Sequence, residues 1–477
     1  MKISKDLLRR IGIALVIIIV TIAVILGAWR PSKRKPSAPQ PEIQTDVPVA
    51  VYENAEKRLK QQQDISYTVA GVKQTIVGKT VLEETFNQTV TYKDLNTDHL
   101  QGYVEEKIVI GTHEIQSHEY FSDDVACFTT QNVSFQAPMT AAEYVSRYIP
   151  ATTIEKALYA TVCGQKVGDV SIFSFEAPTA VEKWLFADEC TLVSASATAT
   201  VDANGNLTGN TYNVEYTKDS VSHKLQLTVT IAASEIQPVQ LQDSSKFKSI
   251  SNINAPKMLE KSCGYLTTLN NITSVYDDTI ICEVFGDKHT STVKISTGNA
   301  SKWTANIEST SAHDDISKPG DTKVTQTFER FKDGVYSYSS DGQNYTTETS
   351  IDLAAMQERC RGYLIGSIIM PEQIVSVTVT ETENTYQLQL HPNEDFASMI
   401  AENACYALYK DATILTGQAQ SHTTNTLSCY MHIDKETGFP VAYGYSYTGN
   451  YILGDLPNLL SFDVKQTFAT PDIPTKP

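Results

Sequence analysis

Histidine, cysteine and acidic residues are the side chains of this sequence that could carry out chemistry. Its nine histidines are scattered over 477 residues, and none forms the H-E-x-x-H motif that places two zinc ligands on one helix face. The sequence also lacks a G-x-S-x-G nucleophile elbow and a glycine-rich phosphate loop. His113 and His118 are five residues apart in a strand-like run, so we expect them on opposite faces. We predict no catalytic residue, no metal site and no cofactor.

Two acidic segments could in principle hold a cation. Asp202, Asn204 and Asn206 resemble the start of a calcium loop, but Asn213 occupies the position where an EF-hand carries its glutamate. Asparagine and glycine tolerate positive φ, so we predict a hairpin turn at this position. The acidic pair that follows His313 lies in a polar run, which favours a solvated loop over a weak cation site.

The cysteines divide unevenly along the chain. Three lie in one half and five in the other: Cys127, Cys163 and Cys190, then Cys263, Cys282, Cys360, Cys405 and Cys429. An odd number on each side requires either a bridge between the halves or at least two free thiols. All lie beyond residue 120, which fits disulfide use outside the cytosol, whereas buried free thiols are the alternative.

A long apolar run near the start predicts a membrane anchor. Residues 11–28 carry no charge, and at 1.5 Å per residue they span about 27 Å, close to the thickness of a bilayer core. Trp29 follows at the expected interfacial position, so we predict a single transmembrane helix over 11–29. A cleaved signal peptide is the alternative, but the run is longer than usual and lacks an A-x-A-like site.

The sequence flanking this run predicts the orientation of the chain. Residues 1–10 are expected to form a cytoplasmic tail and 30–50 a proline-rich linker, so that the body lies outside the cytoplasm and the protein is a single-pass protein of the cell membrane. Basic residues flank both sides of the run, so charge alone does not decide the orientation. The formal charge of the whole chain is −17, and most of the basic excess lies in residues 1–35. The acidic body argues against nucleic acid as a partner.

Alternating patterns dominate the body and predict half-buried antiparallel strands. The clearest strand-like runs are 81–95, 102–111, 224–233, 374–390 and 460–468. Helical runs interrupt them, and the expected helices cover residues 51–63, 140–149, 179–190, 352–364 and 394–405. We therefore predict an α+β fold with strongly curved antiparallel sheets and helices packed on one face.

The order of these elements indicates an internal duplication. Phe121, Asp123, Val125 and Phe128 match Phe331, Asp333, Val335 and Tyr338 at a constant offset of 210, and the turn at Asp202 matches the turn at Asp434. Chance similarity between two β-rich halves is the alternative explanation. We predict two tandem domains, 51–245 and 256–470.

The paired aromatic–Asp turns at 121–128 and 330–338, with the late hairpin 433–443, resemble those of the LolA/LppX-like superfamily of exported proteins. That resemblance would cover most of residues 50–470 as two copies. It implies a strongly curved sheet with helices on its concave face, and an apolar concavity that holds acyl chains or a protein. It implies no catalytic residues.

These features predict a membrane-anchored, non-enzymatic binding or scaffold protein whose partners, besides the bilayer at 11–29, are a lipid-like ligand or an envelope protein. The alternatives are an envelope hydrolase whose carboxylates converge only in three dimensions and a structural or sensory ectodomain without a pocket. If a ligand cavity exists, Trp184, Phe186, Phe396 and Met399 are the candidates to line it; the alternative is that they close the core.

Overall fold

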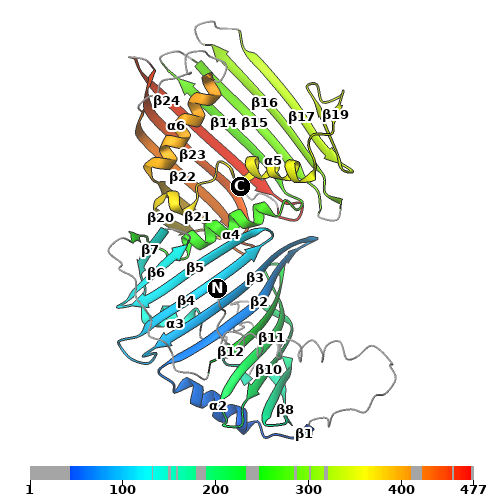
Figure 1. Cartoon of the computed structure of the whole chain (residues 1–477), viewed down its shortest axis with the longest axis vertical. Helices are drawn as coiled ribbons and strands as arrows, with labels where there is room; N and C mark the ends of the chain where they lie inside the picture. Colours follow the sequence, from blue (N-terminus) through cyan, green and yellow to red (C-terminus); the bar gives the residue numbers. More distant parts are fainter. Residues whose placement is uncertain are drawn as a thin grey trace, which may run out of the picture. The chain divides into compact units, whose positions relative to one another are not determined.

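The computed structural model describes most of the chain beyond residue 42. The described residues are 43–130, 133–148, 152–156, 159–178, 190–232, 247–283, 287–299, 302–315, 321–409, 422–453 and 456–473. From Thr45 onward they form one compact unit, which consists mainly of two large antiparallel sheets with few helices (Figure 1). The predicted span at 11–29 lies outside the described residues, and no helix within them is long and apolar enough to cross a membrane.

The first sheet is assembled from two runs of strands that meet where β12 pairs with β2. The first run follows α2 (Ala50–Lys60) and comprises β2 (Ile65–Val77), β3 (Thr80–Lys93), β4 (Gln101–Ile110), β5 (His113–Ser122), β6 (Val125–Thr130) and β7 (Val133–Pro138). The second run follows α3 (Ala141–Ser146) and comprises β8 (Tyr159–Val167), β9 (Val170–Pro178), β10 (Thr191–Val201), β11 (Leu207–Lys218) and β12 (Val221–Ile231). Two short strands, β1 (Ile43–Thr45) and β13 (Lys248–Ser249), lie outside these runs, and β13 pairs with β7 in parallel.

The second sheet is assembled in the same way, with β24 paired to β14. Its first run follows α4 (Ala255–Thr267) and comprises β14 (Thr273–Cys282), β15 (Asp287–Thr297), β16 (Ala305–Asp315), β17 (Lys323–Lys332), β18 (Val335–Ser339) and β19 (Thr346–Glu348). After α5 (Leu353–Ile365) and the 3₁₀ turn η5 (Pro371–Gln373) come β20 (Ile374–Glu381) and β21 (Thr385–Pro392), then α6 (Glu394–Tyr409), β22 (His422–Asp434), β23 (Pro440–Leu453) and β24 (Leu456–Ala469).

The strand order is the same in the two sheets. From one edge to the other, β7-β6-β5-β4-β3-β2-β12-β11-β10-β9-β8 in the first corresponds to β19-β18-β17-β16-β15-β14-β24-β23-β22-β21-β20 in the second. The turns that align in the sequence also occupy equivalent places: Asp123 joins β5 to β6, and Asp333 joins β17 to β18. Both aspartates have positive φ, 51° and 53°, as two-residue hairpin turns require. The duplication itself stays a prediction.

Several expected elements need correction. The run 374–390 is not one strand, because Thr382 and Thr385 close a turn between β20 and β21. The predicted solvated loop around His313 is wrong, since this residue lies in β16 opposite His289 of β15. Helix α4 was not predicted. The hairpin predicted at Asp202 is confirmed, and its carboxylate accepts bonds from the backbone N–H groups of Asn204 and Asn206.

None of the eight cysteines forms a disulfide. Seven are buried and Cys163 is exposed. Of the two alternatives that the sequence left open, the structure therefore has the one without disulfides, and the buried cysteines pack as small apolar side chains.

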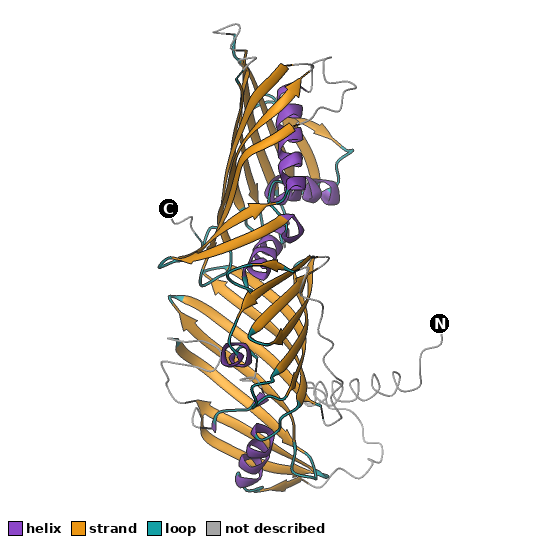
Figure 2. Cartoon of the chain, turned by 90° about the vertical axis from the view of Figure 1, so that its left-hand side faces the viewer, coloured by secondary structure: helices purple, strands orange, loops and turns teal. Residues whose placement is uncertain are grey.

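One face of the first sheet carries its buried side chains, as the alternating burial along β4 and β12 shows. We call it the inner face, because α3 and α4 pack against it. Gly102 of β4 lies on this face between Tyr92 and Phe121, and the ring of Tyr144 from α3 fills the space that a side chain at Gly102 would occupy. Figure 2 shows how far strands outnumber helices in the chain.

Candidate functional site

Three neighbouring strands each place one glutamate on the inner face. Glu84 of β3, Glu106 of β4 and Glu119 of β5 are 5%, 5% and 2% exposed. Each occupies a position in the alternation where an apolar residue would be expected. Ionised carboxylates in such surroundings require cations, because burying an unpaired charge costs several kcal/mol.

Helix α4 supplies most of the cations. Lys257, Lys261 and Tyr265 follow one another at intervals of four residues and therefore share one helix face. The Lys261 ammonium lies 2.5 Å from Oε2 of Glu84, and the Tyr265 hydroxyl donates to Oε1 of the same carboxylate at 2.5 Å. Lys257 pairs with Glu106, which also accepts a hydrogen bond from the Gln88 amide. Gly264 allows this close approach, since a Cβ there would lie 3.2 Å from Ile110.

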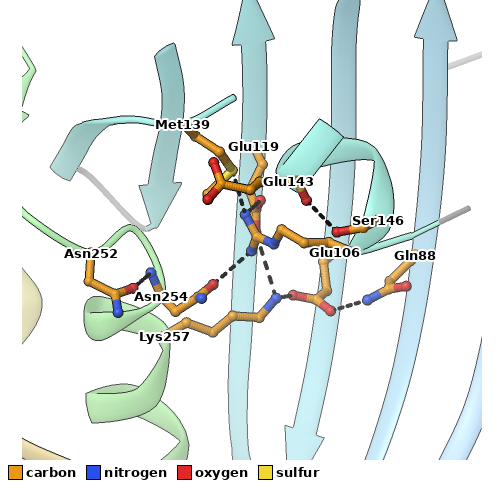
Figure 3. A network of polar contacts seen from close by, with 10 residues as sticks. Gln88, Glu106, Glu119, Met139, Glu143, Ser146, Asn252, Asn254 and Lys257 are labelled. Carbon is orange, nitrogen blue, oxygen red and sulfur yellow. Dashed lines mark hydrogen bonds and ion pairs between the residues drawn. The ribbon is translucent and has the colours of Figure 1, made fainter. Parts of the chain in front are cut away.

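The third carboxylate is held by an arginine just after α3. Arg147 Nη2 donates to Glu119 Oε1 at 3.2 Å, and Arg147 Nη1 lies 3.0 Å from Oε2, so the guanidinium forms an ion pair with both oxygens and a hydrogen bond with Oε1. Arg147 Nη2 also donates to Asn254, the residue before α4, at 2.8 Å. Lys257 lies 3.8 Å from Glu119 and so links the two carboxylates of β4 and β5. Figure 3 shows the part of this network around Glu106, Glu119 and Lys257. We call the whole network the inner-face charge cluster: Glu84, Glu106, Glu119, Arg147, Lys257, Lys261 and Tyr265.

Pairing outweighs burial in the electrostatics of the cluster. Burial by itself would raise the pKa of Glu84, but the ammonium groups of Lys261 and Lys73 and the hydrogen bonds from Lys261 and Tyr265 hold it at about 2. Burial opposes ionisation of Glu106 too, yet Lys257 and the amide of Gln88 keep its pKa below the ordinary value. Both carboxylates therefore stay ionised at neutral pH.

The cations respond in the opposite sense. Burial would lower the pKa of Lys257 and of Arg147, but the nearby carboxylates raise both above their ordinary values. At the margin of the cluster, Lys73 lies directly opposite Glu84 on β2, and burial lowers its pKa. Burial and the charge of Lys73 likewise lower the pKa of His223 to about 4, so this imidazole is neutral at pH 7.

Glu260 differs from the three sheet carboxylates. It lies on α4, is 3% exposed, and its Oε1 accepts a hydrogen bond from Thr130 at 2.8 Å. Its Oε2 is buried and has no hydrogen-bond partner. Burial raises the pKa of this carboxyl to about 7, although the bond from Thr130 acts against the rise.

The arrangement is suited to holding elements together. Catalysis by a carboxylate pair needs one group that is protonated and another that is free to reach substrate. Here the three sheet carboxylates are buried and engaged by cations. Among the described residues, no group of three or more His, Cys, Asp and Glu side chains is placed to hold a metal ion.

The residues predicted to line a cavity are only partly described. Trp184 and Phe186 lie outside the described residues. Phe396 of α6 is fully buried and meets the ring of Tyr445 edge-on at 6.1 Å, and Met399 is partly buried against the same core. For Phe396 this position matches the alternative expectation, that it closes the core.

Two of the cavities lined by described residues lie elsewhere, in the first half of the chain. One, of about 130 Å³, lies between α2 and the β10–β11 hairpin beside Leu59 and Leu207. The other, of about 280 Å³, lies on the outer face of β3, β4 and β5 beside Asn87, Lys107 and His118.

Most of the charge cluster was missed at the sequence level. Its carboxylates interrupt the apolar series of three alternating strands without indicating what would neutralise them, and its lysines belong to a helix that was not predicted. One signal was present: Lys257 and Lys261 are four residues apart, after a proline at Pro256 that suits a helix start.

Comparisons with known proteins do not assign the chain to a family. No family model and no curated protein sequence matches it. Among solved structures, the ywiB protein from Bacillus subtilis has 9% identity and a TM-score of 0.14, and the match covers 37% of this chain and 99% of that one. A putative AttH from Nitrosomonas europaea has 7% identity and a TM-score of 0.13, covering 87% and 94%. A protein of unknown function of the DUF3598 family from Nostoc punctiforme has 9% identity and a TM-score of 0.12, covering 84% and 95%. Similarities this low carry no argument about fold or function, and the resemblance to the LolA/LppX-like superfamily stays a prediction.

Proposed function

We propose that the protein is a non-enzymatic scaffold of the cell envelope, anchored by a helix over 11–29 and exposing two LolA-like β-rich domains outside the cytoplasm. Its partner would be an envelope protein or a lipid-like molecule. The observation that carries the non-enzymatic part is the inner-face charge cluster, whose buried carboxylates are neutralised by lysine and arginine side chains.

Between the two partner classes, the described interior favours the protein. Large aromatic side chains fill the space between sheet and helices, as Tyr144 does over Gly102 and Phe396 does beside Tyr445. The two cavities beside α2 and on the outer face of β3, β4 and β5, of about 130 and 280 Å³, are smaller than the roughly 300–1,000 Å³ of ordinary small-molecule sites. A scaffold needs surface and rigidity more than volume.

The anchor is tested with intact cells that produce the full chain. Protease added from outside should remove the body and leave a short membrane-bound stub, while alkaline washing should leave the untreated chain in the membrane. A body that external protease cannot reach, or a mature form that begins near Trp29 and is free in the medium, would contradict the anchored topology.

The binding mode is tested on full-length protein purified in detergent from a lipid-containing host. Solvent extraction and mass spectrometry should show no phospholipid in excess of that recovered from an unrelated single-pass protein prepared in parallel. Stoichiometric release of one lipid class would overturn the scaffold interpretation and favour a lipid carrier. A Phe396→Ala variant would then show whether α6 borders the ligand.

A further inference from the structure

Helix α4 packs against strands of the first sheet and also against elements of the second half of the chain. One side carries the lysines that bind Glu84 and Glu106, and the helix packs there against β4 and β5. Other sides of the helix pack against α5, η5 and β20. Nearby, Lys248 of β13 donates to the backbone oxygen of Ile374 at 2.5 Å, and Ser251 donates to that of Val377 at 3.3 Å. We call this region the α4 joint.

Glu260 occupies the centre of the α4 joint without a cation of its own. Thr130 at the end of β6 donates to one of its oxygens, and the other oxygen is buried and without a hydrogen bond. Lys257, one turn earlier on the helix, is already shared between Glu106 and Glu119. A neutral carboxylic acid fits this environment, whereas a carboxylate would be a buried charge with a single hydrogen bond.

The charged groups on the surrounding elements do not offset a charge at Glu260. On α5, Arg359 pairs with Glu329 and Arg361 pairs with Glu358. On η5, Glu372 is itself acidic and disfavours ionisation of Glu260.

Two further groups complete these surroundings. Lys248 directs its ammonium to backbone oxygens of the η5–β20 segment. His113 of β5 lies beside Gly264 of α4, and burial lowers its pKa.

We propose that Glu260 is a pH-sensitive latch: its protonated form keeps the α4 joint closed, and its ionisation as the pH rises to neutrality and above loosens the contacts of α4 with β6 and η5. The group that leaves is the carboxyl proton, which passes to solvent when the joint opens. The inference concerns the conformation of the body and does not depend on where the body resides.

The direction of the pH effect follows from linkage. Glu260 has an ordinary pKa of 4.5, and burial raises it to about 7 in the closed joint. The closed form therefore binds the proton more tightly than any form in which the side chain meets water. Raising the pH from about 4.5 to about 7 progressively favours opening, and above pH 7 the full effect is present.

Hydrogen exchange of the α4 amides in the full-length protein tests the latch. After correction for the intrinsic pH dependence of exchange, the opening constant of residues 255–267 should rise on the order of 70-fold between pH 5 and pH 8. In Glu260→Gln, which keeps the shape without the titration, that rise should disappear while any contribution from His113 persists. An exposed glutamate on α6 supplies the matched control, and Glu402→Gln should behave as the wild type does.

A second variant keeps the test decisive if the first folds poorly. Thr130→Val removes the hydrogen bond that lowers the pKa of Glu260, so the rise in opening should extend to higher pH than in the wild type. Wild-type exchange that is flat from pH 5 to pH 8, or an unchanged profile in Glu260→Gln, would overturn the proposal.

Discussion

At the scale of single residues, the packing around Gly102 requires a residue without a side chain. Tyr92 and Phe121 lie opposite this glycine on the neighbouring strands, and Tyr144 enters the gap between them. Its ring stacks on Phe121 with centroids 4.6 Å apart. A Cβ at Gly102 would lie 2.2 Å from the ring of Tyr144, so the position excludes every other residue type unless α3 moves.

We predict that Gly102→Ala lowers the free energy of unfolding by about 2 kcal/mol, because the added methyl group overpacks the site and displaces α3. Chemical denaturation of the full-length protein measures the change. Gly362→Ala is the control: this glycine is exposed within α5, nothing lies within 4 Å of its added Cβ, and alanine favours the helix by about 1 kcal/mol. Equal effects of the two substitutions would contradict the packing argument.

The pair of Arg147 and Glu119 supports a second residue-scale prediction. Arg147→Ala leaves a buried carboxylate without its bidentate partner, and we expect a loss of about 3 kcal/mol in unfolding free energy. Replacing both residues, as Arg147→Met with Glu119→Leu, should cost much less, because no uncompensated charge remains. A double variant as unstable as the sum of its single variants would show that the two residues act independently.

At the scale of elements, a short helix positions Arg147. Helix α3 has only six residues, and its first turn is closed by a capping box in which the Thr140 hydroxyl accepts from the Glu143 N–H while the Glu143 carboxylate accepts from the Thr140 N–H. Such reciprocal bonds satisfy two amides that the helix cannot pair itself.

We predict that Thr140→Ala lowers the free energy of unfolding by about 1 kcal/mol and accelerates hydrogen exchange across α3. Glu143→Gln retains the bond back to Thr140 and should change stability far less. Since the box orients the segment that ends at Arg147, Thr140→Ala and Arg147→Ala should also be less than additive. If the losses in unfolding free energy of the two variants were fully additive, the capping box would not act through Arg147.

The elements also show how far the sequence could predict this fold. Long alternating strands such as β3, β4 and β12 are correctly anticipated, because burial on one face imposes a period of two residues. Helix α4 was missed although Lys257, Glu260 and Lys261 recur at helical spacing; ten of its thirteen residues are buried, so its polar face meets protein and not solvent.

The charge cluster escapes for a related reason. Glu84, Glu106 and Glu119 are far apart in the sequence, and only the register of β3, β4 and β5 brings them to one face. In the strand patterns each occupies an inward position, where a glutamate interrupts the apolar series without indicating that its charge is buried. A buried carboxylate is recognisable only once its cation is located, and here that cation comes from an unpredicted helix or from beyond α3.

At the scale of the whole molecule, the two sheets share one strand order, and α4 stands where α2 stands in the first half of the chain. If the halves arose by duplication, the helix before each first strand has been used differently. In the first half α2 packs Tyr52 against Phe173 and Phe175. In the second half, one side of α4 instead carries the lysines that bind the first sheet.

Because Glu84 and Glu260 both meet α4 or lie on it, we expect stability to fall on both the acidic and the alkaline side of an optimal pH. Glu84 has a pKa of about 2 when folded against an ordinary 4.5, so the stability it contributes is present above pH 4.5 and is lost as the pH falls toward 2. The loss amounts to about 3 kcal/mol, at 1.36 kcal/mol per pKa unit. Glu260 acts in the opposite sense and costs stability as the pH rises from 4.5 to 7. These two groups together favour greatest stability near pH 4.5.

Denaturant unfolding of the full-length protein at pH 3, 4.5 and 7.5 tests this profile. Glu84→Gln should lose most stability at pH 4.5 and 7.5 and less at pH 3, because the contribution of the wild-type carboxylate fades as the pH falls toward its pKa of about 2. Glu260→Gln should instead gain most at pH 7.5, where the wild type carries the buried charge. At pH 7.5 the two substitutions should therefore change the free energy of unfolding in opposite directions. A change in the same direction would contradict the opposite roles assigned to Glu84 and Glu260 beside α4.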